Sequence, residues 1–472
     1  MADGALMELV SRGKKDAYFL QGARRTWFGT SYERRPAQSR EIRIAYPVGP
    51  VSFDHWFDIE LPRDSDILMS VDIRLQMPTW LPTPVAEVNR TKIVELDTGE
   101  KTVMGATVWA RYGWTNGIAN YLFPRWALFA DNYMLTEGWG EFNSWFPDME
   151  TTQLKAPLLH AATGTHNGSE THVQWNATPR ELVFRVPLMG CQGDSDVGLP
   201  LCALKGQRLY LRFWVAPKEK LVETGLVNRG LVGAPPDYGL CPKPWGGRAI
   251  RIRNSDADPG VISPYTTLQE HEIKPPSIYA RFAVLNVEEE TRRALLAQPI
   301  QILFHQQQRE DWIMNERDFT PGAAYRHRLE IHGFFQALFL GFLSDARQLQ
   351  NKYRDINPPG RGEWVLNLGL NVNGTDRIHF WPPKKFQELA NNTQLARDVE
   401  VDLYYLIFGV NPEGEPAGTC NLSRTQKTVL HLNLEDIPWS PTERRQATAS
   451  VLGLSWNVFE VREGVGRLVF VD

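Results

Sequence analysis

The sequence has few cysteines and no motif that pairs them. Only four of its 472 residues are cysteine, and they lie far apart with no Cys-x-x-Cys spacing. This usage excludes a disulfide framework and indicates a reducing compartment. We therefore expect free thiols that pack as small apolar groups, at Cys191, Cys202, Cys241 and Cys420.

The sequence also lacks a charge excess and a long apolar run. Its 51 basic and 55 acidic residues leave a net charge of -4, so nothing in the charge favours genome binding. The most apolar run, residues 334–343, is too short to span a bilayer. Asp3 and Glu8 stand where a secretory signal would be apolar or basic, so we expect no cleaved signal.

Motifs for common enzyme chemistry are missing as well. The chain contains no Gly-x-Ser-x-Gly, no His-Glu-x-x-His and no phosphate-binding loop. His160, His166 and His172 lie six residues apart, a spacing that matches neither a strand face nor a helix face. Glu137 and Glu141 have helical spacing, but the two glycines between them disfavour a helix. The sequence therefore predicts no catalytic, cofactor-binding or metal-binding residue.

What the chain does contain is aromatic residues and segments with a period of two. Aromatics make up 11% of the residues, with 16 tryptophans, which suits sandwich cores and extensive subunit contacts. Alternating apolar and polar residues are typical of half-buried antiparallel strands. They occur at residues 41–46, 70–77, 181–186, 208–215 and 364–372.

Two of these segments make specific predictions about which side chains face the core. In residues 41–46 the apolar set is Ile42, Ile44 and Tyr46. In residues 364–372 the apolar set is Trp364, Leu366, Leu368, Leu370 and Val372. Each set is predicted to point inward.

Three other stretches have a different character. Residues 106–150, rich in Trp and Gly, are interpreted as long loops with one short helix. Residues 217–276 hold 9 of the 32 prolines and 7 glycines, which predicts a long loop. Residues 286–298 are predicted to be a helix that Asn286 caps and Pro299 stops.

Residues 401–434 read as strand, loop and strand, and the loop carries a specific string. Residues 416–424, PAGTCNLSR, resemble the Pro-(Ser/Ala)-Gly-Thr-Cys-Asn-Phe-Ser-Arg segment of the major capsid proteins of nucleocytoplasmic large DNA viruses. The N-terminal signature of that family is also matched, although Lys14 and Lys15 replace its usual Ala-Gln. The matching residues are Gly13, Asp16, Tyr18, Phe28, Tyr32 and Arg34.

Further matches to the same family follow in order along the chain. Residues 198–204, GLPLCAL, resemble the string before its penultimate first-domain strand, and residues 279–298 resemble its interdomain junction. Residues 371–377 and 456–472 resemble its Asn-Gly-x-Asp-Arg turn and its closing segment. The resemblance is weakest over residues 80–175 and 217–276.

The periodicity alone indicates two all-β sandwiches with long loops. The resemblance implies more: two consecutive eight-stranded antiparallel jelly rolls with long loops and a short connecting helix. It places an N-terminal arm at residues 1–25, a first jelly roll at 26–287 with a long insertion at 217–276, a connecting helix at 288–298 and a second jelly roll at 299–472.

The resemblance also implies a structural function without catalysis. We expect a subunit of an icosahedral viral capsid, with three copies in a pseudo-hexagonal capsomer that is made and assembled in the host cytoplasm. Its partners would be neighbouring capsomers and minor capsid proteins beneath the shell, close to an inner membrane. The sequence fits both the principal subunit of the shell and a minor paralogue of that subunit. The alternative is a carbohydrate-binding or carbohydrate-active tandem β-sandwich that uses tryptophans as stacking platforms.

Overall fold

The structure is a computed structural model of the whole chain. It describes residues 38–78, 114–152, 154–165, 181–189, 191, 198–224, 274–319, 324–349, 351–358, 363–393, 403–409, 418–435 and 445–470, together with the backbone of a few strands outside these ranges. The expected N-terminal arm at residues 1–25 lies outside the described residues.

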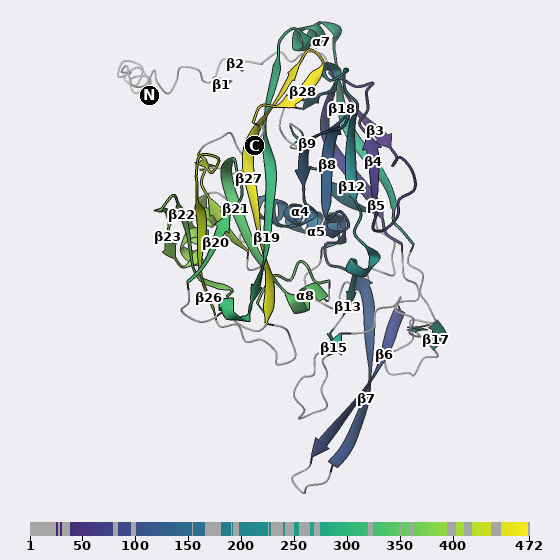
Figure 1. The fold of residues 1–472 in the computed structure, drawn as a ribbon. Helices are drawn as coiled ribbons and strands as arrows, with labels where there is room; N and C mark the ends of the chain where they lie inside the picture. Colours follow the sequence, from purple (N-terminus) through teal and green to yellow (C-terminus); the bar gives the residue numbers. More distant parts are fainter. Residues whose placement is uncertain are drawn as a thin grey trace, which may run out of the picture.

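The first half of the chain forms two facing antiparallel sheets (Figure 1), one of which also holds the short strand β11 (Leu199–Pro200) beside β5. One sheet, which we call the first outer sheet, has the order β10-β5-β18-β3. Its strands are β3 (Gln38–Ala45), β5 (Ile67–Gln76), β10 (Glu181–Arg185) and β18 (Ser277–Val287). The facing sheet has the order β4-β12-β8-β9. Its strands are β4 (Trp56–Glu60), β8 (Arg125–Ala130), β9 (Tyr133–Gly138) and β12 (Leu209–Trp214).

The second half repeats this plan. One sheet, the second outer sheet, has the order β19-β27-β21-β24. It consists of β19 (Ile300–Asn315), β21 (Phe334–Ser344), β24 (Tyr404–Ile407) and β27 (Gln446–Arg462). The facing sheet has the order β20-β26-β22-β23. It consists of β20 (Ala324–Leu329), β22 (Val365–Val372), β23 (Thr375–Trp381) and β26 (Thr428–Leu434).

Both halves have the strand order of a jelly roll. Counted along each half, strands one, eight, three and six share one sheet, and strands two, seven, four and five share the other. The prediction of two consecutive eight-stranded antiparallel jelly rolls is therefore confirmed. Most of the predicted core faces are confirmed too, because the alternate apolar residues of β5, β10 and β12 are buried between the two sheets of the first roll.

A separate five-stranded sheet extends from one end of the first roll (Figure 1). The hairpin of β6 (Pro84–Glu95) and β7 (Lys101–Trp114) belongs to the connection between the third and fourth strands. Strands from the connection between the seventh and eighth strands pair with it. These are β13 (Val222–Thr224), β16 (Ile250–Arg253) and, beside β16, β17 (Tyr265–Leu268).

Residues 217–276 are therefore more than the long loop that the proline count predicted. The same connection holds a second pair of short strands, β14 (Leu226–Val227) and β15 (Gly239–Leu240). The pairing with β6 and β7 brings the two long connections to the same end of the roll, as expected when successive strands reverse direction.

The interpretation of residues 106–150 as loops is wrong. This stretch contains the end of β7, the core strands β8 and β9, and two helices, α3 (Ile118–Tyr121) and α4 (Gly140–Glu150). Its glycines suggested loops, but two of them lie in regular elements where neighbouring atoms leave no room for a side chain. A Cβ at Gly138 would lie 2.6 Å from the Trp126 ring, and one at Gly140 would lie 1.9 Å from a backbone carbonyl oxygen.

Two smaller predictions are also corrected. Leu366 is 41% exposed instead of buried, because the register of β22 against β26 shifts between Val365 and Asn367. Asn286 does not cap the helix, since β18 continues to Val287 and Glu288 stands at the N-cap of α7 (Glu289–Leu296).

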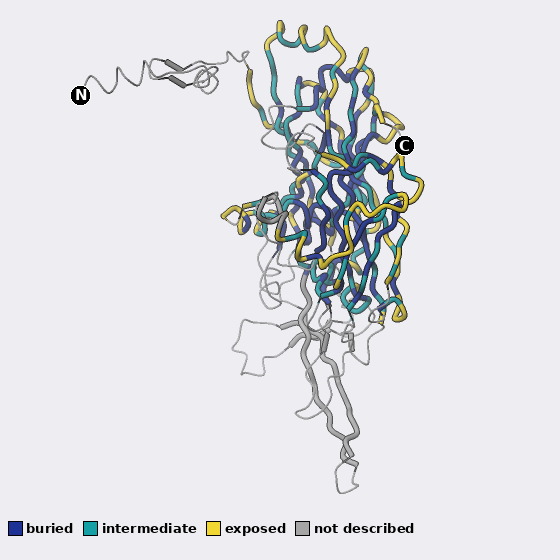
Figure 2. The backbone as a smooth tube through the Cα atoms, turned by 90° about the vertical axis from the view of Figure 1, so that its left-hand side faces the viewer, coloured by how far each residue is buried: buried dark blue, intermediate teal, exposed yellow. Residues whose placement is uncertain are grey.

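The two rolls share buried contacts. Side chains from β19 and β27 of the second roll belong to the core of the first roll, namely Ile302, Phe304, Phe459 and Val461. Figure 2 shows the resulting distribution, with buried backbone running through the middle and exposed backbone at the turns and ends. None of the described helices is long and apolar enough to cross a membrane.

Candidate assembly surfaces

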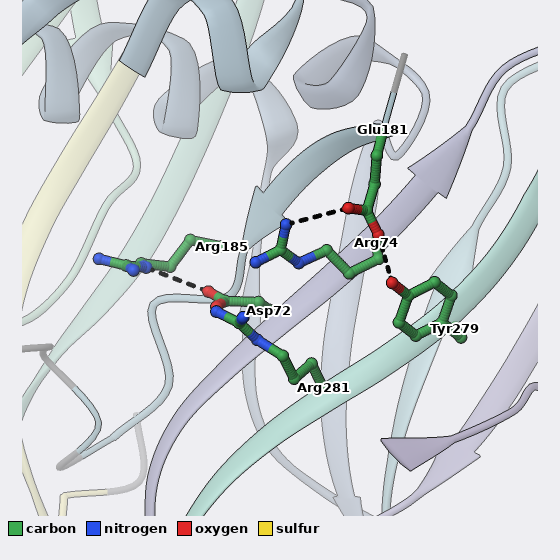
Figure 3. Close-up of polar contacts among 6 residues, drawn as sticks. All are labelled: Asp72, Arg74, Glu181, Arg185, Tyr279 and Arg281. Carbon is green, nitrogen blue, oxygen red and sulfur yellow. Dashed lines mark hydrogen bonds and ion pairs between the residues drawn. The ribbon is translucent and has the colours of Figure 1, made fainter. Parts of the chain in front are cut away.

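The outward side of the first outer sheet carries a row of charged side chains (Figure 3). Asp72 lies on β5, opposite Arg185 of β10 and Arg281 of β18. Its carboxylate accepts a hydrogen bond from Arg185 Nε at 3.2 Å and one from Arg281 Nη2 at 2.8 Å. Asp72 is only 3% exposed, so the two guanidinium groups cover a carboxylate on a face that would otherwise be wet.

A second polar row lies next to the first, again across three strands (Figure 3). Arg74 Nη1 lies 3.5 Å from Glu181 Oε2, and the Tyr279 hydroxyl donates a hydrogen bond to the other oxygen of Glu181. That hydrogen bond to a carboxylate raises the pKa of Tyr279. The charges of this face are thus paired within the sheet, and a partner that covered it would not have to bury an unpaired charge.

The edge of the same face is apolar. Ile42 of β3 is 61% exposed and Ile44 57%, and Tyr46, directly after β3, is 71% exposed. The Tyr46 ring lies 6.4 Å from that of Tyr279, so the apolar edge joins the polar rows. The strand order places β3 at the edge of the sheet. An edge strand with exposed large apolar side chains is a site for association with another chain.

The prediction that these three residues face the core is wrong, and the pairing of β3 with β18 gives the reason. Phe282 of β18 points into the core and lies opposite Arg43, whereas Ile44 lies opposite the outward Arg281. Glu41, Arg43 and Ala45 therefore take the inward positions. Arg43 forms ion pairs with Glu41 at 3.0 Å and Asp64 at 3.3 Å. The apolar side of β3 is thus presented outward by the register.

In the second roll the corresponding outward face is covered by the first roll. Helix α4 packs three aromatic side chains against β21, β24 and β27 of the second outer sheet. Phe142 and Phe146 lie 6.0 and 5.7 Å from Phe339, in edge-to-face geometry. This buried layer contains Phe142, Trp145, Phe146, Ala337, Phe339, Ile356, Leu403, Tyr405, Leu452 and Leu454.

An ion pair and a hydrogen bond hold α4 on that face. Arg309 Nη1 of β19 lies 2.9 Å from Glu141 Oε2, and the Trp139 backbone N–H donates to Gln307 Oε1 at 3.1 Å. Burial raises the pKa of Glu141, and the positive charge of Arg309 opposes that rise.

A loop of the second roll forms hydrogen bonds with the long connections of the first roll. The Asn351 side-chain amide donates to the carbonyl oxygens of Glu219 and Val222, both at 2.6 Å. The Thr115 hydroxyl donates to the Asn351 carbonyl oxygen at 2.5 Å. Beside them, Lys352 Nζ lies 3.6 Å from Glu223 Oε1. Burial raises the pKa of Glu223 to about 6.

The second roll has its own exposed aromatic corner, where β23 leads into α9 (Pro383–Thr393). Phe380 is 40% exposed and Trp381 49%. The Trp381 ring stacks 6.3 Å from Phe386, and Lys385 Nζ lies 5.1 Å from the centre of the Trp381 ring. We call Phe380, Trp381, Lys385 and Phe386 the β23–α9 corner.

The polar residues noted in the sequence are not brought together into a reactive site. Glu137 lies on β9 and accepts a hydrogen bond from Arg125 Nε at 2.8 Å, whereas Glu141 lies in the first turn of α4 and pairs with Arg309. His160 lies on α5 (Ala156–Thr163), and His166 and His172 lie outside the described residues. Within the described part of the chain, no three His, Cys, Asp or Glu side chains lie close enough together to hold a metal ion.

Solved structures of viral capsid proteins match the chain over nearly all of its length. The PBCV-1 virus capsid structure matches with a TM-score of 0.66 at 14% identity, covering 95% of this chain and 100% of that one. The Faustovirus major capsid protein gives 0.63 at 9% identity, with 96% and 94% covered. The mavirus major capsid protein gives 0.50 at 7% identity, with 94% and 93% covered.

At such identities the likeness shows the fold, which is that of double jelly-roll capsid proteins. No protein-family model matches the sequence, and neither does any curated protein.

Proposed function

We propose that the chain is a structural subunit of an icosahedral viral capsid and has no catalytic activity. The observation that carries this proposal is the match of two complete jelly rolls, over 95% of this chain and the whole of the matched chain, to the PBCV-1 capsid structure. The sequence motifs of the large DNA virus capsid family lie in the same order along the chain and support it independently.

In this proposal three copies form a pseudo-hexagonal capsomer, and capsomers tile the shell of the virion. The other partners are minor capsid proteins beneath the shell, near an inner membrane, and assembly takes place in the host cytoplasm. The arm at residues 1–25 faces this inner layer. The insertion at residues 217–276 lies on the outward side or reaches over a neighbouring subunit.

The proposal is tested by the mass of the purified protein in solution. A ring of three requires two different contact patches on each subunit, and a permanent assembly buries about 2,000 Å² or more per pair. We expect size exclusion with light scattering to give a trimer at micromolar concentration. A monodisperse monomer with native circular dichroism would contradict the proposal.

The rival class, a carbohydrate-binding tandem β-sandwich, finds less support. Several tryptophans that would have to stack on sugars are buried in the cores, among them Trp114, Trp126, Trp145 and Trp364. Glu137 and Glu141 are each engaged by a different arginine. A glycan array on the purified trimer tests this class directly, and we expect no binding.

A further inference from the structure

The two jelly rolls carry equivalent helices. In the first roll, α4 follows the fifth strand, β9, after the single residue Trp139. In the second roll, α9 follows the fifth strand, β23, after the single residue Pro382. Both helices have 11 residues, and both lead to the sixth strand of their roll. The corner that contains α9 is therefore the counterpart of the corner that contains α4.

The corner of the first roll already has a docking place within the chain. Through Phe142, Trp145 and Phe146, α4 lies on the outward side of the second outer sheet. The first outer sheet offers the equivalent outward side, on which Ile42, Ile44 and Tyr46 are more than half exposed. One corner is thus docked, while the other corner and one sheet face keep exposed aromatic and aliphatic residues.

We propose that the β23–α9 corner of one copy docks on the outward side of the first outer sheet of a second copy, as α4 docks on the second outer sheet within one chain. This inference rests on the proposed capsid function. The contact is head-to-tail, because the corner and the receiving face are different surfaces of each subunit. Three such contacts close a ring in which every jelly roll receives the corner of the roll before it.

The chemistry of the two surfaces fits such a contact. The receiving face combines exposed Ile and Tyr side chains with arginines, and the corner brings Phe380 and Trp381. Tyr, Trp and Arg are the residue types that dominate interface energies. The guanidinium groups of Arg185 and Arg281 would meet aromatic ring faces, to which cations are attracted.

The two sheets also differ in the way that this contact requires. The outward side of the second outer sheet is apolar and is covered as the chain folds. The outward side of the first outer sheet keeps its charges paired around Asp72, which allows it to remain in water before assembly. A surface that is exposed to water before assembly is more polar than a surface that is buried during folding.

The experiment uses three full-length variants and light scattering. Ile44→Asp places a charge on the receiving face, and Trp381→Asp places one on the corner. Ile313→Asp is the matched control, because Ile313 is 60% exposed on β19, the strand equivalent to β3. We expect the first two variants to have one third of the wild-type trimer mass and the control to keep it. Circular dichroism and thermal unfolding check that each variant is folded.

Mixing the two monomeric variants provides the sharpest test. Ile44→Asp keeps an intact corner, and Trp381→Asp keeps an intact receiving face, so a 1:1 mixture should form dimers through one native contact. Trimers of either variant, no dimer on mixing, or loss of the trimer in the control as well would overturn the inference. A monomeric wild-type protein would instead contradict the proposed function itself.

Discussion

The ring of Trp145 occupies the space that Gly341 leaves open. A Cβ on Gly341 of β21 would lie 2.6 Å from Cη2 of Trp145, closer than carbon atoms approach without displacement. Helix α4 of the first roll thus rests on the second outer sheet at a position where only a glycine fits. Gly341 and Trp145 therefore set how closely α4 can approach β21.

We expect Gly341→Ala to destabilise the protein by about 1–3 kcal/mol, since the added methyl group overpacks the Trp145 ring. Urea unfolding measures the loss. The control is a double-mutant cycle with Trp145→Ala, in which the cost of the alanine at position 341 should shrink. An equal cost in both backgrounds would show that the glycine acts through something other than this contact.

Asn351 combines a strained backbone with two buried hydrogen bonds. Its φ of 62° lies in the left-handed region, and its amide holds two carbonyl oxygens of the first roll. Asn351→Gly tolerates the left-handed backbone conformation but removes both side-chain hydrogen bonds, and this loss should cost about 1–3 kcal/mol. Asn351→Ala adds about 1–2 kcal/mol of backbone strain. Thermal unfolding should rank wild type, glycine and alanine in that order, and equal glycine and alanine variants would contradict the role of the backbone.

Glu223 makes stability depend on pH. Burial raises its pKa from the ordinary 4.5 to about 6, while Lys352 opposes the rise. Between these values the folded protein holds a proton that the unfolded chain releases, so the free energy of unfolding falls as pH rises through this window. The shift corresponds to about 2 kcal/mol.

We therefore expect Glu223→Gln to gain stability over wild type as the pH rises from about 4 to about 7. Urea unfolding across this range measures the difference. The same substitution at the exposed Glu463 is the control and should leave the pH profile of wild type unchanged. Parallel profiles of wild type and Glu223→Gln would contradict the assignment.

Limited proteolysis locates residues 217–276. Strands of this insertion pair with the β6–β7 hairpin, which extends from one end of the first roll (Figure 1). If that end faces outward, the insertion should be cleaved at the same rate in intact particles as in isolated trimers. Protection in particles alone would place it inside the shell and contradict the proposal.

The sequence predicted strands well where a single face was buried. In β5, β10 and β12 the alternation alone identified the core residues, because a strand buried on one face only has a period of two. It failed at β3 for an instructive reason. Alternation says which residues share a side of a strand but not which side meets the core, and at β3 the apolar side points out.

The candidate assembly surfaces could not be predicted for the same reason. Ile42 and Ile44 read as core residues, and only the pairing with β18 shows that they are exposed. Phe380 and Trp381 gave no signal, since exposed aromatic residues and core aromatic residues look alike in a sequence. The glycines of residues 106–150 suggested loops, although two of them admit close neighbours inside the fold.

Side chains of the second roll complete the core of the first roll, and this affects how the protein folds during translation. Phe459 and Val461 lie far downstream of every strand of the first roll, yet they help to fill its core. During translation the first roll therefore leaves the ribosome with part of its apolar core uncovered. Strand β27 covers this part only after most of the second roll has been translated. Until then the nascent chain exposes apolar surface that is prone to aggregation. A chaperone that binds this surface would prevent association before folding is complete.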